Sequence, residues 1–178
     1  MWKTRGLRGS ALEEALNITN EKYREKKLAL IQKIPTPIKP MEIDKQKGQI
    51  KLAYFEQKST VDYVGVVQGI PVCFDAKECA TKTFALANIH PHQVQYMREF
   101  EGQDGIAFLL IHFTSENLYY YVPCRDMLRF WERAEEGGRK SFRMEELDDR
   151  YMVKVTGGVF IHYLEVLNLD LENRDNGM

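Results

Sequence analysis

Apolar and polar side chains alternate from Ile70 to Lys77, with the apolar side chains at the even positions. A period of two is typical of a β-strand that buries one face. A second strand-like run spans Tyr63 to Val67, and Gln68-Gly69 between the two runs has the composition of a tight hairpin turn. The pattern therefore predicts an antiparallel hairpin in which Asp62 returns beside Asp75.

The rest of the hydrophobic pattern predicts both helices and strands. Ser10-Ala11-Leu12-Glu13 has the form of a capping box, and apolar residues follow it at helical spacing. Ile106 to Phe113 is apolar throughout, as in a central strand that is covered on both faces. We expect helices at 11–27, 91–100 and 126–136 and strands at 28–34, 106–113, 118–122 and 151–155, while 159–169 stays open between a strand and an amphipathic helix. These elements predict an α/β fold with a mixed central sheet flanked by helices.

The length of the chain suits one domain. With 178 residues and 44% hydrophobic content, the chain can bury a substantial core. On the helix at 126–136, Met127, Phe130 and Trp131 are expected to face inward, and Trp131 is expected in the core. The tail from Glu172 onward is predicted to be disordered.

An insertion is predicted from 35 to 58. Pro35, Pro37 and Pro40 exclude a helix at its start and favour an extended, kinked path. Two aromatic residues, Tyr54 and Phe55, lie among lysines, a combination that suits unstacked nucleic-acid bases. The same two aromatic side chains are equally consistent with packing at the base of the insertion or in a dimer contact. The lysines of the insertion are Lys39, Lys45, Lys47, Lys51 and Lys58.

Composition excludes several classes of protein. The three cysteines form no C-x-x-C pair, so neither a disulfide framework nor a zinc site is indicated. No apolar run approaches the roughly twenty residues of a membrane span, and no signal-peptide apolar region follows the first residues. We therefore expect a cytoplasmic protein with no membrane partner.

Charge is divided unevenly along the chain, although the formal net charge is only −1. Residues 1–58 contain thirteen Lys and Arg against seven Asp and Glu, whereas residues 59–178 contain twelve against nineteen. A basic arm beside an acidic body is typical of a protein that binds a polyanion and a metal ion. A merely solvated, lysine-rich surface is an equally good explanation.

Asp62, Asp75 and Lys77 are the residues with the clearest candidate chemistry. Asp75 and Lys77 share one face of their predicted strand, because they have the same parity. Mg²⁺ is commonly held by one or two carboxylates, with water and phosphate in its other positions. A lysine beside such a metal adds a positive charge where negative charge develops on phosphate. An acid and a lysine at this spacing are also common on solvated strands, so the spacing alone does not identify a site.

Two segments carry more information than the spacing of the acids and the lysine: Ser59-Thr60-Val61-Asp62-Tyr63-Val64-Gly65 and Phe74-Asp75-Ala76-Lys77-Glu78. In these segments the chain resembles the RecU family of Holliday-junction resolvases. Further segments agree in order: Arg8-Gly9, Lys33-Ile34-Pro35-Thr36-Pro37, Ala53-Tyr54-Phe55, Asn88-Ile89-His90-Pro91-His92-Gln93, Gln103-Asp104-Gly105-Ile106, Phe130-Trp131 and Gly138-Arg139-Lys140-Ser141. The resemblance implies a restriction-endonuclease-like core with a protruding stalk at 35–58. It also implies a homodimer that nicks four-way junction DNA in recombination and repair, with RecA recombinase and branch-migration proteins as partners.

By motif position, the resemblance implies roles for individual residues. Mg²⁺, for which Mn²⁺ can substitute, would be bound by Thr60, Asp62, Asp75 and Gln93, and Lys77 would stabilise the transition state. Glu13, on the first predicted helix, is a candidate additional acid. The candidate DNA-binding residues are Arg8, Lys39, Lys45, Lys47, Lys51, Tyr54, Phe55, Lys58, Arg139 and Lys140.

The chain departs from the family pattern in three places. Asp75 stands where Glu is usual, the spacing to Gln93 is one residue short, and the basic segment before Arg8 is nearly absent. The shorter carboxylate requires a small shift of the metal or the strand. Two alternatives therefore stay open: a restriction-type endonuclease of the same fold, and a non-catalytic protein that binds junctions or modulates a recombinase.

Overall fold

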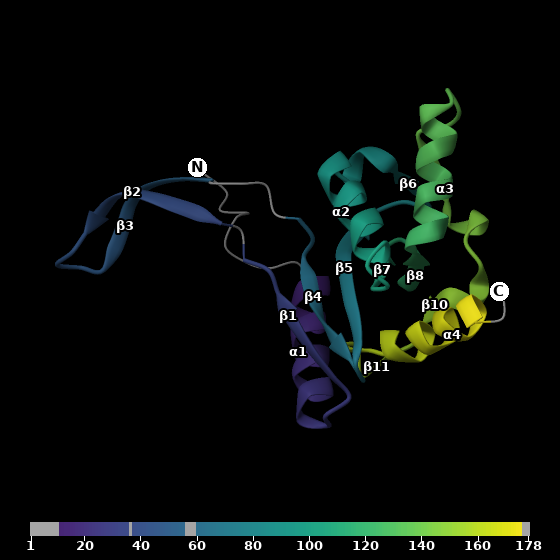
Figure 1. Ribbon diagram of the computed structural model, residues 1–178, viewed down its shortest axis with the longest axis horizontal. Helices are drawn as coiled ribbons and strands as arrows, with labels where there is room; N and C mark the ends of the chain where they lie inside the picture. The colour runs from purple at the N-terminus through teal and green to yellow at the C-terminus, as the bar shows by residue number, and fades with distance from the viewer. Residues whose placement is uncertain (1–10, 36, 56–59, 176–178) are drawn as a thin grey trace.

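The computed structural model describes residues 11–35, 37–55 and 60–175 of the chain. The candidate DNA-binding residues Arg8 and Lys58 lie outside these ranges, as does the side chain of Phe55. The body of the protein is a sheet with helices on both faces (Figure 1). None of the helices within the described ranges is long and apolar enough to cross a membrane.

Six strands form the central sheet in the order β1-β4-β5-β7-β8-β10. They are β1 Ala29–Lys33, β4 Tyr63–Val67, β5 Ile70–Cys79, β7 Ile106–Phe113, β8 Leu118–Pro123 and β10 Met152–Val153. β5 and β7 pair in parallel, and every other neighbouring pair is antiparallel. This arrangement confirms the predicted α/β fold with a mixed central sheet.

Helices α1 (Ala11–Glu25) and α4 (Tyr163–Asp175) cover one face of the sheet. Beneath them, the ring of Phe74 stacks between Tyr63 and Phe108, with 4.7 Å between the ring centroids in each pair. Because these rings come from β4, β5 and β7, they hold together the three strands that carry the candidate site.

Helices α2 (Pro91–Glu101) and α3 (Cys124–Glu135) cover the other face. Met97 of α2 and Met127 of α3 are fully buried there, and Phe130 is nearly so. Trp131, which was expected in the core, is only partly buried at the edge of this layer. That expectation was wrong because Trp131 follows Phe130 around the helix and leaves the buried face.

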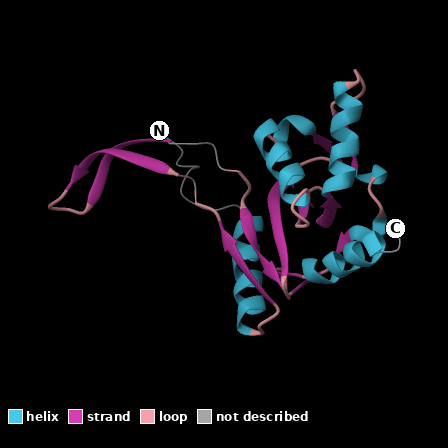
Figure 2. Cartoon of the chain, in the orientation of Figure 1, coloured by secondary structure: helices cyan, strands magenta, loops and turns pink. Residues whose placement is uncertain are grey.

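A two-stranded hairpin projects from the body (Figures 1 and 2). It consists of β2 (Ile38–Asp44) and β3 (Gln49–Phe55), which pair antiparallel with irregular register near Glu42. Its large apolar side chains are exposed along both strands, namely Ile38, Met41, Ile43, Ile50, Leu52 and Tyr54. Among the described elements, the main packing partner of each of these two strands is the other strand.

Short elements complete the chain. β6 (Thr83–Ala85) pairs with β9 (Ser141–Arg143), and β11 (Val155–Thr156) pairs with β12 (Phe160–Ile161). Three short 3₁₀ helices lie between larger elements: η1 (Leu86–Asn88), η2 (Met144–Glu146) and η3 (Asp149–Tyr151). The strand predicted at 151–155 is therefore divided into η3, β10 and β11, and the ambiguous region at 159–169 contains both β12 and the start of α4.

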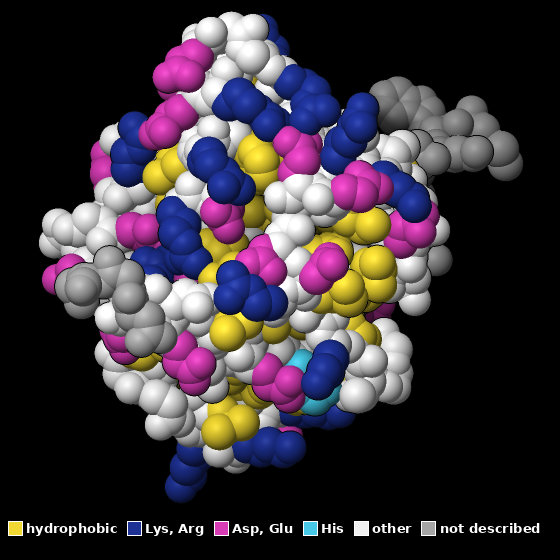
Figure 3. Space-filling model, turned by 90° about the vertical axis from the view of Figure 1, so that its right-hand side faces the viewer, with side chains coloured by type: hydrophobic (Ala, Val, Ile, Leu, Met, Phe, Trp, Pro, Cys, Tyr) yellow, Lys and Arg dark blue, Asp and Glu magenta, His cyan; other side chains and the backbone are white. Residues whose placement is uncertain are grey.

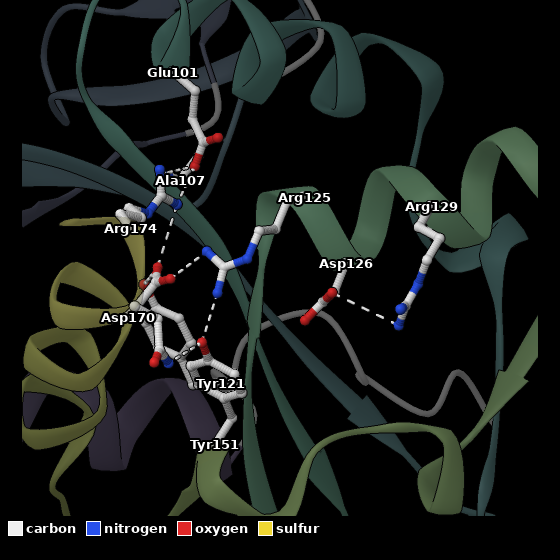
Figure 4. A network of polar contacts seen from close by, with 10 residues as sticks. Glu101, Ala107, Tyr121, Arg125, Asp126, Arg129, Tyr151, Asp170 and Arg174 are labelled. Carbon is white, nitrogen blue, oxygen red and sulfur yellow. Dashed lines mark hydrogen bonds and ion pairs between the residues drawn. The ribbon is translucent and has the colours of Figure 1, made fainter. Parts of the chain in front are cut away.

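The C-terminal helix corrects the prediction of disorder from Glu172, because α4 continues to Asp175. Fully buried Asp170 accepts hydrogen bonds from Tyr121, Arg125 and Arg174, and Arg174 also donates to Glu101 at 2.6 Å (Figure 4). A buried carboxylate requires such partners. This network ties the end of α4 to β8, α3 and α2, and supplies the order that local composition did not predict.

Candidate active site

The β4–β5 hairpin has the predicted turn and register. Gln68 and Gly69 both have positive φ, at 49° and 89°, as a type I′ turn requires. Tyr63 pairs with Phe74, so that Asp62 and Asp75 follow at opposing positions. The predicted approach of Asp62 to Asp75 is thereby confirmed.

Each aspartate binds the backbone of the opposite strand. Asp75 Oδ1 accepts the N–H of Asp62 at 3.0 Å, and Asp62 Oδ2 accepts the N–H of Ala76 at 3.0 Å. These reciprocal hydrogen bonds continue the hairpin beyond its last regular pair. They also fix two carboxylates side by side at the end of β4.

Asp75 is the electrostatically unusual member of the pair, because its side chain is 0% exposed. Lys77 Nζ lies 2.5 Å from Asp75 Oδ2, although this oxygen has no aligned hydrogen bond. Burial and then the Asp62 carboxylate raise the pKa of Asp75 to about 7, and Lys77 opposes the rise. A cation placed between the two carboxylates would relieve the repulsion that the fold imposes on them.

Gln93 reaches this pair from the first turn of α2. Pro91 begins the helix, and Gln93 Oε1 accepts the N–H of His90 at 3.0 Å as part of a capping arrangement. Gln93 Nε2 donates to Asp75 Oδ1 at 3.0 Å. In this structure Gln93 therefore offers Asp75 a donor, and its amide would have to turn to offer a metal its oxygen.

Thr60 and Glu13 lie at the border of the site. Thr60 is exposed and precedes buried Val61, which leads into the hairpin. Glu13 pairs with Lys33 at 2.6 Å, and Lys33 lies opposite Tyr63 in the sheet. Glu13 is thus at the same end of the sheet as Asp62.

The donor set fits a hard cation. Two carboxylates converge, and Asp75 Oδ2 is buried with only an ammonium group beside it. Within the described ranges, no group of three or more His, Cys, Asp and Glu could hold a metal ion. Mg²⁺ does not need such a cluster, because it usually keeps several waters and takes one or two protein carboxylates.

The candidate DNA-binding residues fall in two separate places. Lys39, Lys45, Lys47, Lys51 and Tyr54 are exposed on the projecting hairpin. Arg139 and Lys140 lie just before β9, and Arg139 is paired with Glu146 at 2.5 Å. Sequence reasoning missed this pairing. Because Glu146 neutralises Arg139, Lys140 is the stronger candidate of the two.

On the face formed by α3 and α4, arginines that suggest a DNA-binding surface in the sequence are paired with acidic side chains. Basic and acidic side chains are interspersed across this face, and apolar side chains lie between them (Figure 3). Arg133 and Arg139 both bond Glu146, and Arg150 bonds Asp148. We find no extended basic surface in this view that would bind a polyanion.

Comparison with known proteins places the chain in a family. The family model for recombination protein U, RecU, matches residues 7–169. Relatives described as Holliday junction resolvase RecU include proteins from Bacillus cytotoxicus, 38% identical over 93% of this chain and 86% of the relative, and Pediococcus pentosaceus, 39% identical over 94% and 86%. The corresponding protein of Limosilactobacillus reuteri is 44% identical over 75% of this chain and 68% of its own.

A solved structure, the Holliday junction resolvase Hjc of Archaeoglobus fulgidus, is 11% identical to the chain. The match covers 66% of this chain and 73% of the Hjc chain, with a TM-score of 0.39. This similarity is too low to assign the fold. The match of the RecU model to nearly the whole chain, together with relatives of about 40% identity, shows that this protein belongs to the RecU family.

Proposed function

We propose that this protein is a metal-dependent endodeoxyribonuclease that resolves Holliday junctions by paired nicks in recombination and repair. The observation that carries the proposal is the convergence of Asp62, Asp75 and Lys77 on one hairpin, in a chain of the RecU family. The relatives named above are Holliday junction resolvases by description.

Asp62 and Asp75 are the proposed Mg²⁺ ligands, and Thr60 and Gln93 complete the set. When bound, the metal would polarise the scissile phosphate and make a water molecule easier to deprotonate. Asp75 keeps its carboxylate in place through the N–H of Asp62 and the amide of Gln93. The shorter side chain of Asp75 therefore sits in a fixed position relative to Asp62.

Lys77 is the proposed stabiliser of the transition state. Its side chain is 20% exposed, so the ammonium group lies between buried Asp75 and the surface that DNA must approach. If the metal were held by Asp75, the ammonium group of Lys77 would be free to face the negative charge that develops on the phosphate. Lys77 would thus exchange the carboxylate of Asp75 for the phosphate of the substrate as its partner.

The projecting β2–β3 hairpin is proposed as the stalk that enters the centre of the junction. It exposes lysines and Tyr54 on an element whose strands pack mainly against each other. A homodimer on a restriction-endonuclease-like core would present two such hairpins and two sites about a two-fold axis. Paired nicks need that symmetry. RecA recombinase and branch-migration proteins are the proposed partners in the cytoplasm.

Cleavage of a labelled four-way junction, beside a linear duplex of the same sequence, tests this function. Wild-type protein in Mg²⁺ should make symmetric nicks in the junction and leave the duplex intact, whereas Asp75→Asn should bind the junction without cutting it. Equal cutting of the linear duplex would favour a restriction-type endonuclease. Binding without cleavage by the wild type in Mg²⁺ and in Mn²⁺ would favour the non-catalytic alternative.

A further inference from the structure

A pocket of about 540 Å³ opens at the start of α2, the helix whose first turn carries Gln93 of the candidate active site. Its walls come from η1, the start of α2 and the last turns of α3. Ile89, Pro91 and Ala134 give it an apolar lining, and Trp131 forms one wall. A volume of this order is typical of pockets that take a small planar molecule.

Trp131 lines this pocket, and its N–H group is already hydrogen-bonded. The indole Nε1 donates to Glu135 Oε1 at 3.0 Å, one helical turn along α3. This bond satisfies the only donor of the side chain and orients the ring. Because Trp131 is only partly buried, part of its aromatic surface remains open to a ligand.

Lys140 supplies positive charge at the same pocket. Its carbonyl oxygen accepts the N–H of Leu86 at 3.1 Å, and the next residue, Ser141, pairs with Ala85. The backbone of Lys140 is thereby held over η1. In the part of the chain that the structure describes, Lys140 makes no ion pair. The lining also contains one acidic residue, Glu135, which accepts the hydrogen bond of Trp131.

The pocket is linked to the candidate active site through the start of α2. His90 lines the pocket, and its N–H donates to Gln93 Oε1. Gln93 Nε2 in turn donates to Asp75 Oδ1. Two hydrogen bonds therefore connect the pocket wall to the proposed metal ligand.

We propose that this pocket binds one unstacked nucleotide of the DNA substrate, with its base on Trp131 and its phosphate at Lys140. The inference rests on the proposed nuclease function. An aromatic ring whose donor is satisfied binds any base by stacking, and an unpaired lysine binds phosphate. A hydrophobic side chain of a partner protein would also fit the apolar wall, but it would leave the ammonium group of Lys140 without a partner. A nucleotide bound in this pocket would fix the position of its DNA strand relative to the cleavage site.

The emission of Trp131 tests the proposal directly. The chain has two tryptophans, so Trp2→Phe leaves Trp131 as the single reporter. We would titrate this protein with a four-way junction, in buffer containing EDTA so that no cutting occurs. Stacking of a base should quench the emission, with a midpoint equal to that of DNA binding measured independently. Emission that stays unchanged at saturating DNA would overturn the proposal and favour a protein side chain as the occupant.

Affinity measurements give a second readout. A stacked base contributes about 1–3 kcal/mol, so Trp131→Leu should weaken junction binding by roughly fivefold to a hundredfold. Trp131→Phe should keep most of the affinity, and this variant with a thermal melt excludes misfolding as the cause. Equal affinity of the wild type and Trp131→Leu would contradict the proposal.

Lys140→Gln should lower the slope of log K against log salt by about 0.7–0.9, as expected for one phosphate contact. The matched control is Lys154→Gln, which removes an exposed lysine between β10 and β11 and should leave the slope unchanged. Equal slopes for both variants would remove Lys140 from the site. The pocket and the proposed function can fail separately. If the wild-type protein cleaves the junction but the emission of Trp131 does not change on DNA binding, only the proposal for the pocket is overturned.

Discussion

The two hairpins β4–β5 and β2–β3 have similar local structure and opposite surroundings. Both are antiparallel, and both carry charged side chains between apolar ones. Helices cover β4–β5 on both faces, so that Phe74 and Asp75 are fully buried. The β2–β3 hairpin leaves Ile43 56% and Leu52 49% exposed.

The difference shows that burial decides what a charged side chain can do. Surrounded by low-dielectric protein and placed beside Asp62, the carboxyl of Asp75 has a raised pKa. The lysines of β2–β3 are exposed to water, and among them Lys51 pairs with Asp44 at 3.6 Å. The β4–β5 hairpin therefore holds the candidate catalytic groups, and the β2–β3 hairpin exposes the candidate DNA-binding lysines.

The largest effect is expected from Asp75→Asn. Loss of one charged group at the site should reduce junction cleavage by about a hundredfold to a thousandfold, because single preorganised electrostatic groups commonly contribute this much. Stability should stay the same or rise, since the neutral amide removes a buried like-charge contact with Asp62. Cleavage rates and chemical denaturation of the same preparation measure both quantities. Wild-type cleavage by this variant would remove Asp75 from the site.

Phe74→Ala, on the same strand as Asp75, should mainly reduce the stability of the protein. Deleting a ring that stacks on Tyr63 and Phe108 should cost about 3–5 kcal/mol of unfolding free energy. Urea denaturation measures the loss. A loss below about 1 kcal/mol would mean that the β4–β5 hairpin is held by something other than this stack.

Mg²⁺ should stabilise the wild-type protein, because it binds the folded carboxylate pair and not the unfolded chain. At a hundred times its Kd, the ion should add about 2.7 kcal/mol to the free energy of unfolding. A thermal melt with and without Mg²⁺ measures this shift, and Asp75→Asn is the control that should lose it. An equal shift in both proteins would place the bound ion elsewhere.

Removal of positive charge from the β2–β3 hairpin should weaken junction binding and leave stability unchanged. Changing Lys39, Lys45, Lys47 and Lys51 to Gln should reduce the salt dependence of junction binding by about 0.9 for each phosphate contact that is lost. Unfolding free energy should be unchanged. An unaltered salt slope would show that this hairpin does not contact DNA phosphate.

Leu52→Ser should have the smallest effect, within about 0.5 kcal/mol of wild-type stability, because the side chain is half exposed. Urea denaturation at several protein concentrations measures it. A loss above about 1 kcal/mol that grows with concentration would show that a second copy of the chain covers this hairpin in solution.

Local sequence was sufficient for several features of the site. The alternation from Ile70 and the Gln68-Gly69 turn determine the hairpin, because side-chain parity and positive φ are properties of neighbouring residues. The start of α2 at Pro91 follows from the same local rules. Once the turn is placed, the approach of Asp62 to Asp75 needs no further information.

Only the tertiary structure decided which of these groups are buried and what they meet. The sequence placed Trp131 in the core, left Arg139 unpaired and predicted disorder from Glu172, and packing changed each of these outcomes. The physical reason is that desolvation and pairing depend on how the elements pack together. Glu146, which pairs with Arg139, follows β9 in the next element, and Glu101, which pairs with Arg174, is 73 residues away along the chain.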